Sequence, residues 1–172
     1  KQMPWANKET GTSPNFWSRS IGWYAMALVD ALDYFPKNHP KRKELIGYLN
    51  NMANALVKFQ DKSGMWYQVT DMGGKEGNYL ESSGTAMFAY AFAKGVNKGY
   101  LPKEFKKAAN KAFNGLTTQL IKVDPDGQIH ITNACAVAGL GGNPYRDGSY
   151  EYYINERKKD NDPKATGPFI LV

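Results

Sequence analysis

The chain has 172 residues, of which 42% are hydrophobic and 22% are charged. This length is enough for one globular domain that buries roughly 70% of its unfolded surface, and the abundance of large apolar residues excludes an intrinsically disordered chain. Every apolar run ends well short of the roughly 18 residues that a membrane-spanning helix needs. With one cysteine, Cys135, and two distant histidines, His39 and His130, we expect no disulfide framework, no metal site and no cofactor.

The formal net charge is +6, from 22 Lys and Arg against 16 Asp and Glu. The excess lies mainly in residues 37–43, 103–111 and 157–164. Lysine runs of this kind are typical of solvated helix faces and loops, and no nucleic-acid-binding motif accompanies them. We therefore expect no nucleic acid and no membrane as partners. At most, the charge favours a preference for anionic small molecules.

Apolar residues recur at the spacing of one helix face in four segments, which predicts four helices. Pro14 and Pro36 bound the first helix, and the turn at residues 61–64 ends the second. The third is small and apolar nearly all round, which is typical of a buried helix. The predicted helices cover residues 15–34, 41–60, 82–97 and 102–121, with extended pieces at 65–69 and 128–131 and a further helix after Pro163.

The predicted elements form an internal repeat. Ser20-Ile21-Gly22 in the first helix corresponds to Ser82-Ser83-Gly84 in the third, and Asp61-x-x-Gly64 after the second helix corresponds to Asp124-x-x-Gly127 after the fourth, at nearly the same offset. Each unit has an inner helix of small residues, an outer lysine-rich helix, a turn and a short strand. Helical hairpins of this kind bury their apolar faces only by stacking. About three hairpins predict an all-α fold that is half of a closed toroid.

The third unit starts near residues 145–149 and is cut off at Val172, and the chain has no initiator methionine and no signal peptide. We therefore expect a fragment. Half a toroid would leave apolar inner-helix surface uncovered, so we also expect either a homodimer across the open edge or low solubility.

Three residues at the start of the first helix are candidates for sugar binding. The indoles of Trp17 and Trp23 could stack on the C–H face of a sugar ring, and the guanidinium of Arg19 could bind a carboxylate with two hydrogen bonds. The alternative is structural: both tryptophans belong to the core, and Arg19 caps or pairs locally. The sequence leaves both interpretations open.

Glu81, Ser82 and Ser83 occupy the same place one repeat later. Serine at a helix start is usually an N-cap, whose oxygen accepts a backbone N–H, and this is the structural alternative. If both repeats point these helix ends into one cavity, however, Glu81 and the two hydroxyls face Trp17 and Arg19. We treat all of them as candidate substrate-binding residues.

The tyrosine-rich segment at residues 139–153 matches no phosphate-binding loop. It suits either the rim of a carbohydrate site or the packing of a long loop. Nothing near His130 completes a Ser-His-Asp or Cys-His arrangement, and Cys135 lies in an apolar run, so we interpret it as a buried thiol without a redox role.

Three motifs in order, at residues 16–30, 81–90 and 139–153, resemble the family 105 glycoside hydrolases, the unsaturated rhamnogalacturonyl hydrolases. The resemblance implies an (α/α)6 barrel that removes a Δ4,5-unsaturated uronic acid from a pectin-derived disaccharide. In that family an Asp protonates C4, water adds at C5, and the resulting hemiketal opens to release the neighbouring sugar. The family's Trp-x-Arg substrate contacts fall on Trp17 and Arg19.

The same resemblance implies that the catalytic Asp, and a His in a Tyr-His-Gly-Trp-Asp segment, lie N-terminal to this chain. No Asp here occupies that motif: Asp30 and Asp33 lie away from the helix entry, and Asp61 and Asp124 are turn residues. We therefore predict that residues 1–172 are the C-terminal half of a single barrel domain, contain no catalytic residue, and are inactive alone.

Two alternatives remain. One is a non-catalytic carbohydrate-binding or scaffolding repeat. The other is a lyase or epimerase, although no Tyr/His or Tyr/Arg base pair is assignable. The partner we expect is an acidic oligosaccharide, whose aglycone stays open, and the sequence leaves localisation open between cytoplasm and periplasm.

Overall fold

The computed structural model describes residues 3–172, so Lys1 and Gln2 of the expected domain lie outside the described residues. These residues form six α-helices, one 3-10 helix and four short strands. In chain order the elements are α1 (Ser18–Tyr34), α2 (Arg42–Leu56), η1 (Val57–Phe59), α3 (Ser82–Asn97), α4 (Phe105–Gln119), β1 (Ile121–Val123), β2 (Ile129–Ile131), β3 (Ala134–Cys135), α5 (Tyr150–Asn155), β4 (Lys158–Lys159) and α6 (Pro163–Leu171). The expected all-α architecture with short strands in the loops is confirmed.

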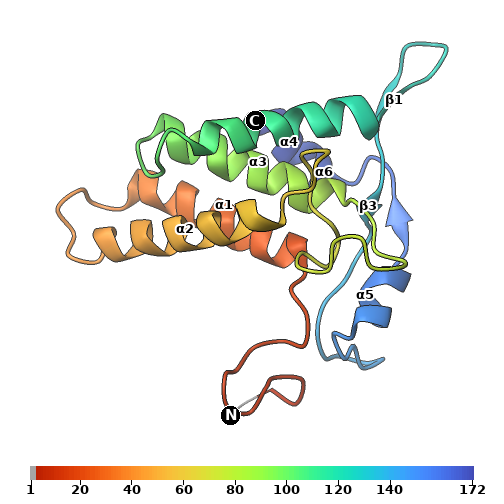
Figure 1. Ribbon diagram of the computed structural model, residues 1–172, viewed down its shortest axis with the longest axis horizontal. Coiled ribbons are helices and arrows are strands. Elements are labelled where there is room, and N and C mark those ends of the chain that lie inside the picture. Colours follow the sequence, from red (N-terminus) through yellow and green to blue (C-terminus); the bar gives the residue numbers. More distant parts are fainter. Residues whose placement is uncertain (1–2) are drawn as a thin grey trace.

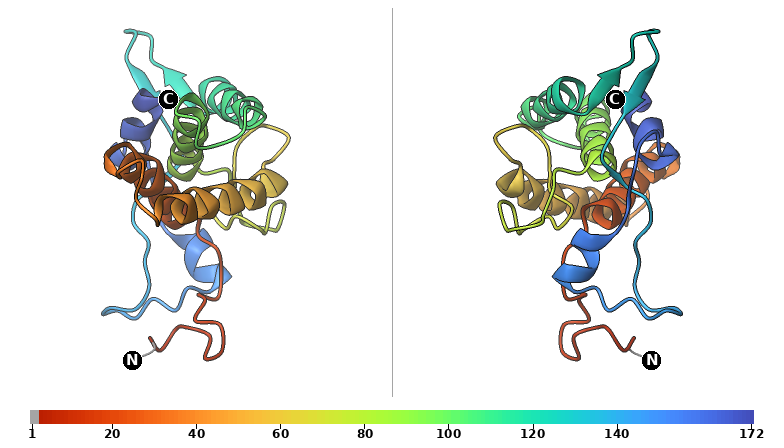
Figure 2. Two further views of the ribbon diagram at one scale, coloured as in Figure 1. Left: turned by 90° about the vertical axis from the view of Figure 1, so that its left-hand side faces the viewer. Right: turned by 90° about the vertical axis from the view of Figure 1, so that its right-hand side faces the viewer.

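Helix α3 lies at the centre of the helical body (Figures 1 and 2). It contacts α1, α6 and α4, which lie on different sides of it, while α2 packs on α1. Inner helices α1, α3 and α6 therefore lie side by side, and α2 and α4 form the outer layer. This is the stacked-hairpin arrangement that the repeat predicts. None of the helices within residues 3–172 is long and apolar enough to cross a membrane.

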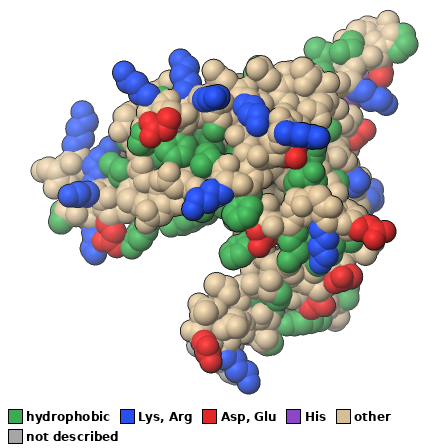
Figure 3. Space-filling view, viewed as in Figure 1, with side chains coloured by type: hydrophobic (Ala, Val, Ile, Leu, Met, Phe, Trp, Pro, Cys, Tyr) green, Lys and Arg blue, Asp and Glu red, His purple; other side chains and the backbone are tan. Residues whose placement is uncertain are grey.

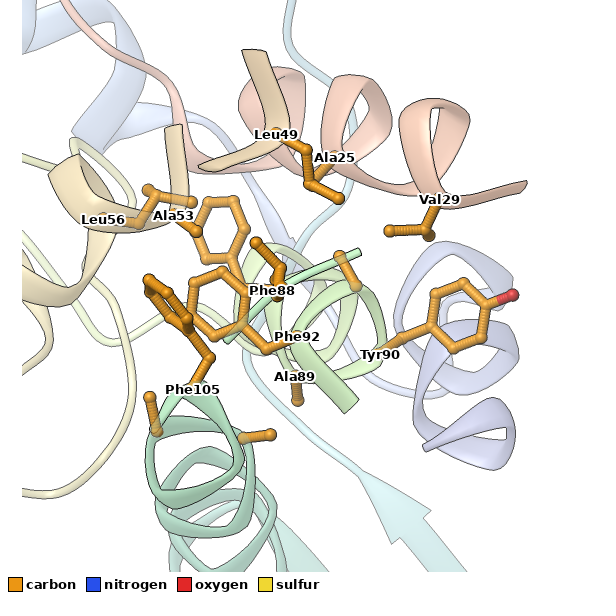
Figure 4. Packing of buried hydrophobic residues seen from close by; sticks show 14 of the residues in the cluster. Ala25, Val29, Leu49, Ala53, Leu56, Phe88, Ala89, Tyr90, Phe92 and Phe105 are labelled. Atoms are coloured by element: carbon orange, nitrogen blue, oxygen red, sulfur yellow. The ribbon is translucent and has the colours of Figure 1, made fainter. Parts of the chain in front are cut away.

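Aromatic side chains bind the outer helices to α3 (Figure 4). The indole of Trp66 meets the rings of Phe88 and Phe92 edge-on, with centroids 5.1 and 6.0 Å apart, and Phe92 contacts Phe105 of α4 at 5.5 Å. The Trp66 Nε1–H donates to the carbonyl of Leu56 at the end of α2. Because Trp66 is fully buried and its one polar atom is satisfied, it fixes the turn after α2 between the two hairpins.

Small residues let the inner helices approach closely. A Cβ on Gly22 of α1 would lie 2.7 Å from the sulfur of Met87, and one on Gly84 of α3 would lie 2.8 Å from the Cβ of Ser18. Both glycines belong to the repeated Ser-x-Gly motif. The motif therefore serves helix packing, because no side chain larger than hydrogen fits at either position.

Several helix ends differ from the sequence prediction: α2 and α4 begin at residues 42 and 105 rather than 41 and 102, and they end at residues 56 and 119 rather than 60 and 121. Helix α1 begins at Ser18 rather than residue 15, because the backbone before it pairs with the loop after α2: Trp17 bridges Val69, and the Thr70 N–H donates to the Phe16 carbonyl. The third unit consists of the short helix α5 and of α6. β1 pairs with β2 and β3 with β4, both antiparallel.

Substituting Gly84 tests the close approach of α1 and α3. Gly84→Ala should destabilise the fold by about 1–3 kcal/mol, because its methyl group would meet the side chain and backbone of Ser18. Gly47→Ala is the matched control: Gly47 lies within α2 with no atom within 4 Å of the added Cβ, so alanine should stabilise by about 0.5–1 kcal/mol. Urea unfolding midpoints measure both, and equal effects of the two substitutions would contradict this account.

Candidate functional site

A small cleft lies where α1 begins, between the N-terminal segment and the loop that precedes α5. It holds about 200 Å³. Its lining consists of Ser13, Asn15, Phe16, Trp17, Ser20, Ile21, Gly139, Leu140 and Tyr153. The Asn15 side-chain amide donates to the Gly148 carbonyl and so ties the two walls together. Figure 3 shows the wider hollow between the helices and the N-terminal segment.

Trp17 forms an aromatic wall of this cleft. It is the N-cap residue of α1 and is half-buried, its ring stacks on Tyr153 at 5.9 Å with the planes 26° apart, and its Nε1–H donates to the Gln68 side chain. Burial raises the pKa of Tyr153 to about 12, so its phenol stays protonated at neutral pH. Aromatic faces bordered by neutral hydrogen-bonding groups suit the C–H and hydroxyl surfaces of a sugar ring.

Beneath the cleft, Arg19 and Glu81 form a buried ion pair. The Arg19 Nη2 lies 3.5 Å from the Glu81 carboxylate, and the two side chains are 1% and 0% exposed. The Arg19 Nε–H donates to the Ser83 hydroxyl, and a terminal N–H donates to the Cys135 carbonyl. The guanidinium carbon also lies 5.6 Å from the centre of the Trp17 ring. The structure therefore brings together four of the residues predicted from sequence.

Glu81 accepts hydrogen bonds from three directions. Its carboxylate accepts from the Ser83 hydroxyl, from the Gly84 N–H and from the Cys135 N–H. It is thus the N-cap of α3, a position for which the sequence suggested Ser82. A carboxylate at a helix N-terminus is favoured by the free N–H groups and the helix dipole.

This geometry favours the structural interpretation of Arg19 and Glu81. Both side chains are buried among α1, α3 and β3; the Nε and Nη2 of Arg19 and both oxygens of Glu81 are occupied by Ser83, by one another and by the backbone. In this arrangement a substrate has no access to the Arg19 guanidinium, so the direct contact expected from the family motif requires movement. Here the ion pair fixes the positions of Trp17, α3 and β3 relative to one another.

The other two candidates stand apart from this network. Trp23 is 47% exposed on α1, away from the ion pair, and contributes an aromatic face to the uncovered side of that helix. Ser82 is fully buried, and its hydroxyl has no hydrogen-bond partner among the described residues. Sequence reasoning gave Ser82 the role that Glu81 performs, because residue type alone does not fix which residue caps a helix.

Several residues of the cleft were not predicted individually. Tyr153, Gly139 and Leu140 come from the tyrosine-rich segment, whose composition was the only signal available. Gln68 was not signalled at all: it is a buried amide that accepts from Trp17 and donates to the Tyr153 carbonyl. Burial raises the pKa of the Cys135 thiol, which is therefore neutral, as expected of a buried cysteine.

A second, apolar groove adjoins the cleft between α1 and α2. It holds about 460 Å³ and shares Phe16, Ser20 and Ile21 with the cleft. Tyr24 and Phe59, which also line it, are 51% and 43% exposed. This is the uncovered inner-helix surface that the half-toroid interpretation predicts. The homodimer expected there stays a prediction.

Comparison with known proteins identifies the family. The sequence profile of Glycosyl Hydrolase Family 88 matches residues 1–172, the whole chain. The chain belongs to this family of glycoside hydrolases. The resemblance found in the three sequence motifs is thereby confirmed.

Solved structures of related proteins identify the fold as well. A glycoside hydrolase of family 105 from C. acetobutylicum ATCC 824 is 51% identical with a TM-score of 0.94, over 98% of this chain and 47% of that chain. Unsaturated glucuronyl hydrolase from Bacillus sp. GL1, 18% identical with a TM-score of 0.61, covers 83% of this chain and 38% of its own and supports the fold alone. The architecture is thus part of the (α/α)6 barrel, and the chain spans about half of the family 105 structure.

Two curated relatives differ in how much of them the chain covers. Protein Atu3128 of Agrobacterium fabrum is 39% identical over all of this chain and 76% of its own length. Unsaturated rhamnogalacturonyl hydrolase YesR of Bacillus subtilis is 29% identical over 86% of this chain and 40% of its own length. The hydrolase thus carries well over half of its length outside the region that this chain matches.

The buried pair predicts a large stability effect. Glu81→Gln should destabilise the fold by about 3–5 kcal/mol, because it preserves the shape of the side chain but leaves the Arg19 charge buried without a counter-ion. Glu44→Gln breaks the exposed pair with Lys41 and should have little effect, since solvent screens that pair. Urea unfolding of both variants checks this, and similar losses would show that the Arg19–Glu81 charges are not coupled.

Proposed function

We propose that this chain supplies the sugar-binding half of an enzyme that hydrates a Δ4,5-unsaturated uronic acid at the non-reducing end of a pectin-derived rhamnogalacturonan oligosaccharide. The observation that carries the proposal is the aromatic cleft formed by Trp17 and Tyr153 at the inner-helix entry. Membership of the glycoside hydrolase family and the likeness to YesR support the substrate class.

In this proposal Trp17 is the direct substrate contact. Its indole stacks on the unsaturated ring, and the hydroxyl of Ser20 and the amide of Asn15 offer hydrogen bonds from the same lining. Trp23, Ser82 and Ser83 are further candidate contacts. Arg19 and Glu81 act from behind the indole, because their buried ion pair fixes the backbone that carries Trp17.

The proton donor is proposed to lie in the preceding part of the barrel. The reaction needs an Asp that arrives protonated and later acts as a base for water, which requires a raised pKa. Asp33 and Asp162 of this chain are shifted in the opposite direction, toward lower pKa. Hydrogen bonds from Lys94 and Tyr100 hold the pKa of Asp33 below its ordinary value, and hydrogen bonds with Lys164 lower that of Asp162 despite its burial.

The aspartates nearest to the core of α1 are also in the wrong place. Asp30 and Asp33 lie in the second half of α1, where they pair with Lys94 at 2.7 and 2.9 Å and accept hydrogen bonds from Tyr90 and Tyr100. This ion network joins α1 and α3 far from the cleft. Its role is structural, which supports the proposal that residues 1–172 alone are inactive.

The proposal is tested by incubating the intact protein with a Δ4,5-unsaturated galacturonyl-rhamnose disaccharide and following the ultraviolet absorbance of the vinyl ether. The absorbance should fall with the intact protein and stay constant with residues 1–172 alone. A folded intact protein that leaves the absorbance unchanged contradicts the activity. Activity of residues 1–172 alone would contradict the assignment of the donor to the preceding region.

A non-catalytic carbohydrate-binding or scaffolding repeat is the second candidate. It is favoured by the observation that the aromatic cleft is formed entirely within this chain and holds no acid. Calorimetric titration of residues 1–172 with acidic oligosaccharides distinguishes the two. Tight binding without turnover by the intact protein would support this second function.

Removing the indole should weaken substrate use. Trp17→Ala in the intact protein should lower kcat/KM about tenfold, since a tenfold change corresponds to about 1.4 kcal/mol and a stacked aromatic contact contributes up to about 1.5 kcal/mol. Tyr34→Ala is the control, because Tyr34 lies at the other end of α1 and is 90% exposed. Equal kcat/KM values for the two variants would place Trp17 outside the site.

A further inference from the structure

The cleft proposed to bind a uronic acid contains no charge. None of its nine lining residues is ionisable near neutral pH, yet a uronate carries a carboxylate that needs a counter-charge when water is excluded. Arg19 is occupied by Glu81, Ser83 and Cys135. If the cleft is to prefer acidic sugars, a positively charged side chain other than Arg19 has to bind the substrate carboxylate.

Arg146 is not itself one of the residues that line the cleft, but it packs against one of them. A Cβ on Gly139, one of the lining residues, would lie 2.7 Å from its Nη1, and a Cβ on Gly142 would lie 3.0 Å from its Nη2. The guanidinium therefore rests directly on the loop that forms one wall, and two glycines leave the space that it fills.

The Arg146 side chain is held through its Nε–H, but its two terminal nitrogens, Nη1 and Nη2, make no hydrogen bond within the described residues. The Arg146 Nε–H donates to the Gly141 carbonyl at 2.9 Å, and the backbones of the two residues pair in both directions. Neither Nη1 nor Nη2 has a hydrogen bond to any residue between 3 and 172. The terminal N–H donors of a half-buried, oriented guanidinium are thus available to a ligand.

No carboxylate of the described chain neutralises Arg146. None lies within 4.0 Å of its guanidinium, and the neighbouring Asp147 accepts from the Ser149 N–H instead. In the buried site, by contrast, Arg19 has its own glutamate. An arginine held at a cleft wall without an acid partner has the features of a carboxylate-binding residue.

We propose that Arg146 binds the carboxylate of the sugar acid and sets the selectivity of the cleft for uronates over neutral sugars. The inference rests on the proposed function and identifies the residue that recognises the negative charge of that substrate. The two terminal N–H groups bind the carboxylate oxygens side by side, while Trp17 and Tyr153 contact the ring.

The test measures affinity for two ligands by calorimetry with the intact protein: the unsaturated galacturonyl-rhamnose disaccharide and its carboxyl-reduced counterpart. The wild type should prefer the acid. Arg146→Gln should weaken binding of the acid about 10- to 100-fold and leave the reduced disaccharide within twofold, whereas Arg146→Lys should retain part of the preference. Arg157→Gln, which removes the same charge from an exposed site, is the matched control and should change neither affinity.

A second variant keeps the charge and moves the guanidinium. Gly139→Ala places a methyl group 2.7 Å from Nη1, and because only the flexible end of the arginine has to yield, the fold should stay intact. Selectivity for the acid should fall in this variant as well. The thermal unfolding midpoints of both variants are compared with that of the wild type. An unchanged midpoint shows that the loss of selectivity comes from lost recognition and not from lost structure.

The outcomes separate the two proposals. If the wild type binds neither disaccharide, the proposed function fails and the role of Arg146 fails with it. If the wild type binds the acid but Arg146→Gln leaves the affinities unchanged, or weakens both disaccharides equally, then Arg146 only shapes the loop and this inference is overturned while the proposed function stands.

Discussion

The arrangement of the candidate site depends on the buried contact between Arg19 and Glu81. One charge comes from the first turn of α1 and the other caps α3, and both reach the backbone of Cys135 in β3. Taking two charges out of water costs several kcal/mol each, so such a pair persists only when hydrogen bonds satisfy the remaining donors and acceptors. Here that requirement links three segments that are far apart in the sequence. The pair therefore specifies how the two repeats and the long loop meet.

Close packing of the inner helices and the buried pair require one another. Gly22 and Gly84 allow α1 and α3 to lie near enough for Arg19 to reach the cap of α3, and a larger residue at either position would separate them. The glycines and the charged residues belong to the same repeated motif at the helix entry. In a stacked-hairpin protein the interface between units supplies much of the stability. The choice of residue is therefore restricted at the few positions where neighbouring units touch. The proposed binding residues at the helix entry thus belong to the same motif as the residues on which helix packing depends.

Much of the fold follows from the sequence, because helix periodicity and the internal repeat are properties of residue type and spacing. The beginning of α1 did not follow, since Trp17 leaves the helix to pair with Val69, which lies beyond the whole of α2. The site was predictable only in part. Residue type marked Trp17, Arg19 and Glu81, but the burial of Arg19 depends on a backbone carbonyl of β3, and the partner of Trp17 is a tyrosine on α5. Neither a carbonyl group nor a contact between the two ends of the chain leaves a local pattern.

The two arginines near the cleft differ in the partners that the chain gives them. Both belong to sequence motifs that resemble the family, and residue type alone would assign a carboxylate to either. Arg19 has its counter-ion within the chain and is 1% exposed, so its charge is neutralised inside the fold. Arg146 lies half-buried on a glycine-rich wall, with its Nε bonded to a carbonyl and with no carboxylate of the described chain within 4.0 Å of its guanidinium. Desolvated charge without a partner is costly, and a bound carboxylate would remove that cost. In the proposed division of roles, the physical distinction between the structural and the recognising arginine is the presence of an internal counter-ion.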